Sequence, residues 1–394
     1  MKFNRLENAD LSGKTAIVRV DFNVPRHDDG KISDTTRIES ALPTINHLKK
    51  AGVKTILLSH FGRPKGEHKP ELSLSFIIPT LSDMLGAPVQ FHEKLSTSVT
   101  DSMTAGDVVL IENTRFAAQE TQGDSGMAQY IAKHGDIFVQ DAFSAAHRRH
   151  ASSAVVGEYL PAYAGLAMER ELDHLAQALE HPKAPVMAVV GGAKVSTKID
   201  LLSNLVEKLD VLVIGGGMAN TFLAAKGHDV GKSLCEHDLA DTARSILNRA
   251  EEASCEIILP VDLVVASDFK AHAPHRTCGL DNVGSDEMIL DAGPETVNLI
   301  ADHMDRAETL IWNGPLGAFE LAPFDTSTVE AAQYAAKLTE SGTLIAVAGG
   351  GDTVAALKHA GAADKFTFIS TAGGAFLEWM EGKALPGVEI LRAK

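Results

Sequence analysis

Short apolar runs alternate with amphipathic segments along the first half of the chain. Residues 36–50 carry apolar side chains at helical spacing from Ile38 to Leu48, which predicts a helix over this range. Four runs predict buried strands: Thr15–Val20, Val53–Ser59, Asp107–Ile111 and Asp136–Val139. Strands that alternate with helices of about 10–15 residues indicate a parallel sheet covered on both faces.

The second half repeats this pattern, and its predicted strands end in glycines. The runs are Val186–Val190, Val211–Ile214, Leu344–Ala348 and Phe366–Ile369, and the first three lead directly into Gly191, Gly215 and Gly349. The fourth leads into the loop Ser370–Gly374. In an open α/β sheet such loops lie at the carboxyl edge, where ligands bind.

The polar, amphipathic stretch Met168–Leu179 is expected to connect the two halves, and Pro182 and Pro185 follow it. A length of 394 residues lets each half bury its own core. The predicted fold is therefore α/β, with two doubly wound parallel-sheet (Rossmann-like) domains joined by a hinge helix.

The charge, the apolar runs and the cysteine pattern of the sequence exclude several kinds of binding partner. The formal net charge of −16 argues against general nucleic-acid binding. The apolar runs are too short to span a membrane, and the first residues lack the apolar stretch of a secretory signal. The three cysteines form no CxxC pair, which indicates free thiols rather than a zinc site. We expect a cytoplasmic protein with no nucleic-acid or membrane partner.

Arginine is concentrated in the first half: residues 1–180 hold nine of the 14 arginines. Five of them lie at predicted strand ends or helix starts: Arg19, Arg37, Arg63, Arg115 and Arg148. A single arginine is most often a solvated surface residue, but a guanidinium also matches phosphate and carboxylate oxygens with two parallel hydrogen bonds. We therefore expect an anion pocket at the ligand-binding edge of this half.

The glycine loops of the second half indicate a phosphate or nucleotide site. Lys194 and Lys198 follow the first loop, and their spacing would place both on one face of a following helix. Asp352 follows Gly350 and Gly351, where a carboxylate could bind Mg²⁺ beside phosphate oxygens or simply cap a helix.

The sequence lacks two kinds of motif that would indicate a specific chemistry. The segment Gly227–Ser233 has three residues between its glycines where a Walker A loop has four, so a polar turn is expected there. The sequence contains neither GxSxG nor HExxH, and it has no reactive cysteine motif. Phosphoryl transfer needs little covalent chemistry from the protein and remains compatible with this pattern.

Taken together and in order, eight segments resemble the phosphoglycerate kinase family almost end to end. They are Arg19–Pro25, Ser59–Pro64, Glu112–Phe116, Asp141–Phe143, Gly191–Lys198, Gly215–Asn220, Trp312–Pro315 and Gly349–Thr353. The resemblance implies the reversible reaction of 1,3-bisphosphoglycerate and ADP to 3-phosphoglycerate and ATP, with Mg²⁺. The acceptor in the ATP-consuming direction is a carboxylate, so no general base is implied.

By match to the family's motifs, the resemblance implies three groups of site residues. The substrate-binding group is Asp21, Asn23, Arg37, His60, Phe61, Gly62, Arg63, Arg115 and Arg148. The nucleotide-binding group is Lys198, Gly293, Glu320, Gly349, Gly350, Gly351, Asp352 and Thr353, with Asp352 near the metal and Glu320 near the ribose. The catalytic group is Arg37, Lys194, Lys198, Gly373 and Gly374.

The resemblance also implies how the domains divide. Residues 1–170 with the C-terminal tail 381–394 would bind 3-phosphoglycerate, and residues 171–380 would bind the nucleotide. The tail Pro386–Lys394 is expected to return to the first domain. Closure about the 168–185 stretch and the residues near Ser370 and Thr371 is expected, in a monomer.

The sequence departs from the family at Ala372 and in Val283–Pro294, and more mildly at Phe61 and Ala318, which are apolar variations. Ala372 stands where the family has glycine, and it would be strained if its φ were positive. The segment Val283–Pro294 lacks the family's glycine- and tryptophan-rich form. The contact to the adenine base that the resemblance implies for Gly293 falls within this divergent segment.

Two other function classes fit the sequence less well. A nicotinamide-dependent dehydrogenase is disfavoured because the fingerprint at Gly215–Asn220 ends in asparagine rather than glycine. A two-lobed, non-catalytic anion-binding protein is disfavoured because lysine, aspartate and threonine side chains follow the glycine loops.

Overall fold

A computed structural model describes residues 2–370 and 372–393, and the chain divides into two compact units. The first unit runs up to Asp173 and includes the C-terminal segment from Ala384 onward, and the second unit is His174–Lys383. The division falls inside helix α6 (Leu166–Leu179), so this helix carries the chain from one unit to the next.

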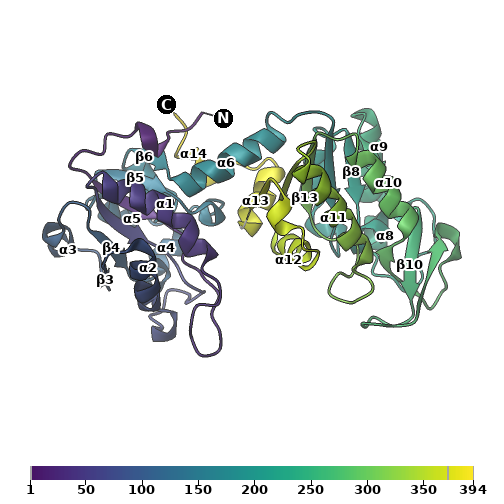
Figure 1. Ribbon diagram of the computed structural model, residues 1–394, viewed down its shortest axis with the longest axis horizontal. Coiled ribbons are helices and arrows are strands. Elements are labelled where there is room, and N and C mark those ends of the chain that lie inside the picture. Colours follow the sequence, from purple (N-terminus) through teal and green to yellow (C-terminus); the bar gives the residue numbers. More distant parts are fainter. Residues whose placement is uncertain (1, 371, 394) are drawn as a thin grey trace. The chain divides into compact units, whose positions relative to one another are not determined.

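The first unit is built on a six-stranded parallel sheet in the order β3-β4-β2-β1-β5-β6. Strands β3, β4, β5 and β6 of this sheet are labelled in Figure 1. Its strands are β1 Thr15–Arg19, β2 Lys54–Leu58, β3 Val89–His92, β4 Val108–Ile111, β5 Ile137–Gln140 and β6 Ala162–Ala164. Its helices are α1 Thr36–Lys50, α2 Ile78–Leu85, α3 Thr97–Ser102, α4 Ala118–Gln122, α5 Ser125–Ala132 and α14 Pro386–Glu389. Every residue of β4 and β5 is buried, as expected of strands covered on both faces.

The second unit has a six-stranded parallel sheet of its own, in the order β15-β14-β13-β7-β8-β9. Its strands are β7 Val186–Val190, β8 Val211–Ile214, β9 Glu256–Ile258, β13 Thr309–Asn313, β14 Ile345–Gly349 and β15 Phe368–Ser370. Its helices are α7 Ile199–Leu205, α8 Gly216–Ala225, α9 Ala240–Glu252, α10 Pro294–Met304, α11 Thr326–Glu340, α12 Gly351–His359 and α13 Gly373–Met380. The predicted α/β class with two parallel sheets is confirmed.

The second unit also contains an antiparallel sheet that the sequence analysis did not predict. It has three strands in the order β11-β10-β12: β10 is Asp262–Ala266, β11 is His275–Gly279 and β12 is Met288–Ala292. Only Cys278 of β11 is buried, so this strand lacks the alternation of apolar and polar residues that would have revealed it.

Each parallel sheet has a point where the strand order reverses, and ligands bind at such points in open α/β sheets. In the first sheet β1 lies between β2 and β5, with Arg19 in register with Leu58 and Gln140. In the second sheet β7 lies between β8 and β13, with Val190 in register with Asn313 and Ile214. The loops that follow these strands therefore lie at one edge of each sheet.

Three local expectations can be compared with the backbone. Lys194 and Lys198 do not share a helical face, because Val195–Thr197 forms a short 3-10 helix and α7 begins only at Ile199, so that expectation was wrong. Ala372 has a φ of −90° and is unstrained, while Gly373 carries the positive φ of 38°. Thr371, part of the expected hinge, lies outside the described residues.

The C-terminal segment packs within the first unit. The backbone N–H of Gly387 in α14 donates to Ala146 O at 2.8 Å, and Asn4 N donates to Leu391 O at 2.7 Å. Among the described residues, no helix has both the length and the apolar character needed to cross a membrane.

Candidate active site

A cavity of about 490 Å³ lies in the first unit and is lined mostly by cationic side chains. Its lining residues are Arg63, Lys65, Arg115, Ala118, Thr121, Gln122 and Arg148. Four of these are cations, and none of the described residues that line the cavity is a carboxylate. The structure therefore brings the predicted residues Arg63, Arg115 and Arg148 together around a space suited to an anion.

Arg115 is held in the cavity wall by the loops that follow β2 and β4. Its Nη1 donates to Gly62 O at 2.8 Å, and its backbone N–H donates to Asn113 Oδ1 at 3.1 Å. Burial, and next to it the charge of Arg19, lowers the pKa of Arg115 to about 10. The guanidinium is thus charged at neutral pH, but nearby protein groups offset only part of its positive charge. This favours the binding of an anion.

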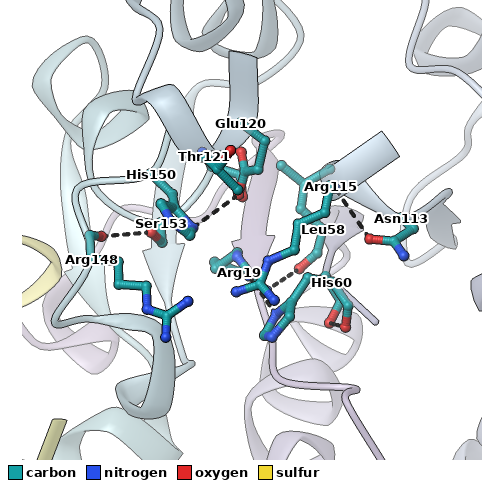
Figure 2. Close-up of polar contacts among 12 residues, drawn as sticks. Arg19, Leu58, His60, Asn113, Arg115, Glu120, Thr121, Arg148, His150 and Ser153 are labelled. Carbon is teal, nitrogen blue, oxygen red and sulfur yellow. Dashed lines mark hydrogen bonds and ion pairs between the residues drawn. The ribbon is translucent and has the colours of Figure 1, made fainter. Parts of the chain in front are cut away.

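A second layer of basic groups lies behind this wall, as Figure 2 shows. Arg19 is fully buried at the end of β1, and its Nη2 lies 2.9 Å from Nδ1 of His60. Because a guanidinium only donates hydrogen bonds, Nδ1 must accept, and the neutral imidazole then carries its proton on Nε2. Burial and the neighbouring charge of Arg19 hold the pKa of His60 well below its usual value. His60 can therefore donate a hydrogen bond from Nε2 without adding charge.

Asp21, Asn23 and Arg37 form a linked group beside these layers. Arg37, in the first turn of α1, pairs with Oδ2 of Asp21, and the same oxygen accepts from Ser144 Oγ at 2.5 Å. Asn23 Oδ1 accepts from Gly62 N at 2.9 Å. Gly62 thus connects Asn23 to Arg115, and its positive φ of 61° explains why glycine stands there.

Phe61 takes a different place from the other predicted substrate-binding residues. Its ring is buried and packs edge-on against Phe76, with ring centroids 5.0 Å apart. Its backbone N–H and C=O are both bonded to the side-chain amide of Asn113. The structure therefore places Phe61 in the support of the loop rather than on the cavity wall.

The second unit contains a larger cavity of about 570 Å³ at the carboxyl edge of its parallel sheet. Glycine loops form one side through Gly192, Gly216 and Gly217, and the other side comes largely from the antiparallel strand β12 and from residues 315–320. Leu234 and Phe269 add apolar surface and are 50% and 64% exposed. A cavity with both backbone amides and apolar walls suits a phosphorylated ligand that also carries a flat ring system.

Lys198 lies at the strand-order reversal of this sheet. Its ammonium group donates to Gly191 O at 2.6 Å, to Asn313 Oδ1 at 2.6 Å and to Asn313 O at 3.1 Å. Burial lowers the pKa of Lys198 to about 8, and the charge of Asp352 partly opposes this effect. Lys194, by contrast, is exposed on extended backbone.

The loop after β14 is fixed by hydrogen bonds around Asn313. Asn313 Nδ2 donates to Gly349 O at 2.8 Å, and Thr353 Oγ1 accepts from Gly314 N at 2.8 Å. Gly350 has a φ of 103°, and a Cβ there would lie 2.9 Å from Asn313 Nδ2. Glycine at this position is therefore required both by the backbone conformation and by the close approach of Asn313.

The remaining predicted residues of the second unit fall into two groups. Asp352, in the first turn of α12, and Glu320 both line the cavity, and Gly373 and Gly374 begin helix α13. Gly293 does not line the cavity. A Cβ on Gly293 would lie 2.2 Å from Oδ2 of Asp262, whose carboxylate accepts from the first backbone N–H groups of α10. The structure gives Gly293 a role in packing against this cap.

The sequence predicted Arg19 as part of the anion pocket and gave no role to Asn113 or Asn313. In the structure Arg19 is fully buried and bonds to His60, while Asn113 bonds to Arg115 and Asn313 bonds to Lys198. Arg19 carried a usable signal, because a charged residue in an apolar strand must find buried partners. Glu120 carried no such signal, since it reads as an ordinary helix residue.

The two sites and the fold define a class: an α/β enzyme with separate cavities for a small anion and for a phosphorylated ligand bearing an apolar ring. Comparison with known proteins gives the family. A family model described as Phosphoglycerate kinase matches residues 6–383. The chain belongs to the phosphoglycerate kinase family.

Individual relatives agree with this assignment over their whole length. The phosphoglycerate kinase of Maricaulis maris is 58% identical over 391 residues, which are 98% of this chain and 97% of the relative. That of Jannaschia sp. is 57% identical and covers 100% of this chain and 99% of the relative. The solved structure of phosphoglycerate kinase from Coxiella burnetii matches with a TM-score of 0.93 at 42% identity, covering 99% and 98% of the two chains.

Proposed function

We propose that this enzyme transfers a phosphoryl group reversibly between 1,3-bisphosphoglycerate and ADP, giving 3-phosphoglycerate and ATP, as a step of glycolysis. Membership of the phosphoglycerate kinase family supports the reaction. The observation that carries the assignment of its substrates is the cavity lined by Arg63, Lys65, Arg115 and Arg148, with no carboxylate among its described lining residues. Such a cavity suits the phosphate of a phosphoglycerate.

The substrate's phosphate would occupy this cavity, and its carboxylate end would lie toward Arg37. Arg63, Arg115 and Arg148 supply charged donors for the phosphate. His60 would add an uncharged donor from Nε2, since Arg19 already occupies Nδ1. Asn23 and Asp21 would act by orienting Gly62 and Arg37, to which they are bonded.

The nucleotide would bind in the larger cavity of the second unit. The backbone at Gly349, Gly350 and Gly351 and the N-terminus of α12 favour phosphate oxygens. Glu320 lines the opposite part of the cavity, where it would accept hydrogen bonds from ribose hydroxyls. The apolar wall of β12 would contact the base, without a contribution from Gly293.

The carboxylate of Asp352 is suited to bind a magnesium ion together with the nucleotide. The carboxylate is exposed and lines the cavity, and Mg²⁺ is usually held by one or two carboxylates together with phosphate oxygens. Among the described residues there is no cluster of three or more His, Cys, Asp or Glu side chains that could hold a metal alone. Bound Mg²⁺ would neutralise part of the phosphate charge, while Lys198 neutralises more of it from the loop side.

Transfer would rely on charge stabilisation and positioning rather than on proton transfer. Arg37, Lys194 and Lys198, together with the N-terminus of α13 at Gly373 and Gly374, would stabilise the charge on the transferring phosphoryl group. The acceptor carboxylate is already ionised at neutral pH, so the protein needs no general base. Because the donor and acceptor bind to different units, transfer requires the units to close and exclude water.

The product's chemistry provides the test. The protein is incubated with MgATP, 3-phosphoglycerate and hydroxylamine, which traps an acyl phosphate as a hydroxamate. We expect hydroxamate to form in proportion to enzyme and only when both substrates are present. ATP consumption without hydroxamate would point to hydrolysis and would contradict the proposed function. We also propose that the enzyme works in the cytoplasm, where its substrates are found, and that it is a monomer, because residues of this one chain line both cavities.

A further inference from the structure

A fully buried carboxylate, Glu120, lies directly behind the cationic wall of the first unit's cavity (Figure 2). It belongs to α4, whose neighbouring residues Ala118, Thr121 and Gln122 line the cavity. Glu120 itself does not line it, so its side chain is turned to the opposite side of the helix. A buried carboxylate needs partners, and those of Glu120 indicate what it does.

Its hydrogen bonds connect α4 to the segment that carries Arg148. Oε1 accepts from Ser152 Oγ at 2.6 Å, and Oε2 accepts from Ser152 N at 2.9 Å. The backbone oxygen of Glu120 also accepts from Ala151 N at 3.0 Å. Ser153 Oγ donates to Arg148 O at 3.1 Å, so the segment anchored by Glu120 also bonds to the backbone of Arg148.

Glu120 also places a negative charge within this cluster of cations. Its Oε1 lies 4.0 Å from Nδ1 of His150, and burial together with the charge of Arg115 lowers the pKa of His150 to about 4. This histidine is therefore neutral at pH 7. The charge of Glu120 acts instead on Arg19 and Arg115, where it opposes the loss of charge that burial favours. Asp21 assists at Arg19.

We propose that Glu120 is a positioning residue that serves as a built-in counter-anion for the arginines of the cavity. When no ligand is bound, its negative charge offsets the repulsion among Arg19, Arg115 and Arg148 and keeps their segments together. A phosphorylated acid bound in the cavity offsets the same repulsion with its own negative charge. Glu120 and the ligand therefore compete electrostatically, so that Glu120 stabilises the empty site and weakens anion binding. This inference rests on the proposed function.

The test is Glu120→Gln, which keeps the shape of the side chain and can still bond to Ser152, but removes the charge. We expect the thermal midpoint of the ligand-free variant to fall by several degrees. Saturating 3-phosphoglycerate should recover most of that loss. In isothermal titration calorimetry, the variant should bind 3-phosphoglycerate about three- to tenfold more tightly than the wild type, as expected from removing one like charge near an anion site.

Asp262→Asn is the matched control, because Asp262 is another buried carboxylate that accepts from the hydroxyl and the backbone N–H of one residue, Thr296 Oγ1 at 2.6 Å and Thr296 N at 2.8 Å, and it belongs to the second unit. Its loss of stability should be equal with and without 3-phosphoglycerate. If Glu120→Gln weakens binding, or loses the same stability in both conditions, Glu120 is merely structural and the proposal is wrong.

Two further outcomes are also decisive. If the Gln variant is unfolded without ligand, 3-phosphoglycerate must restore a cooperative unfolding transition, and failure to do so contradicts the proposal. If the wild type itself does not bind 3-phosphoglycerate, it is the proposed function that fails. Titration of both proteins with inorganic phosphate then tests Glu120 alone, because the Gln variant should still bind this smaller anion more tightly.

Discussion

The ammonium group of Lys198 lies 2.6 Å from the side-chain oxygen of Asn313, at the point where the strand order of the second sheet reverses. The amide nitrogen of the same asparagine donates to Gly349 O, so one side chain connects the loops after β7, β13 and β14. All three N–H donors of the lysine are used by these loops. A nucleotide phosphate can therefore bind Lys198 only by replacing one of these oxygens.

This arrangement predicts how activity depends on pH. Because the pKa of Lys198 is lowered to about 8, its positive charge is lost as the pH rises through that value. We expect kcat/KM for MgATP to fall above pH 8, approaching about tenfold per pH unit. Lys198→Arg should abolish this alkaline limb, since a guanidinium stays charged there. Lys198→Ala should raise KM for MgATP at all pH values, and unchanged kinetics would remove Lys198 from the nucleotide site.

Substitution of Arg37 is predicted to lower mainly kcat. Its guanidinium pairs with Asp21 and would stabilise charge on the transferring phosphoryl group. Arg37→Ala should lower kcat by about 10²–10³-fold, the usual loss when one transition-state charge contact is removed. Arg149→Ala is the control, because Arg149 is an exposed arginine that pairs with Glu158 at 2.7 Å, and its kcat should change little. A nearly wild-type kcat for Arg37→Ala would contradict the assigned role.

Gly350 tests the backbone of the nucleotide loop. Alanine there would adopt a strained φ of 103° and would press a Cβ against Asn313. We expect Gly350→Ala to lower stability by about 1–3 kcal/mol and to raise KM for MgATP at least tenfold, with KM for 3-phosphoglycerate unchanged. Gly361→Ala separates the two effects, since Gly361 also has a positive φ, 65°, but no atom within 4 Å of the added Cβ. That control should lose stability without a change in KM, as measured by steady-state kinetics and thermal unfolding.

The sequence predicted the periodic elements well and the long-range contacts poorly. Helix α1 matches the predicted range Thr36–Lys50, because its buried residues repeat at helical spacing. Strand β11 was missed because most of its residues are exposed. The shared helical face for Lys194 and Lys198 was wrong because a 3-10 helix separates them, a detail of turn geometry that residue spacing does not encode.

In the two sites, too, residues at strand ends could be predicted from the sequence, whereas residues held by long-range contacts could not. Strand ends placed Arg63, Arg115 and Arg148 at one edge of the sheet, and the structure brings them to one cavity. No pattern could place Glu120 behind them, since its partner Ser152 is 32 residues away along the chain. Roles for such residues come from tertiary contacts, which local periodicity does not contain.

The reaction proposed for this chain is the transfer of a phosphoryl group between a nucleotide and a phosphoglycerate. The most direct measurement is the transfer from MgATP to 3-phosphoglycerate, followed through a coupled reductive reaction that consumes 1,3-bisphosphoglycerate. We predict turnover that saturates with both substrates and requires both of them. No turnover above background, with the coupling enzyme shown to be active, would contradict the account.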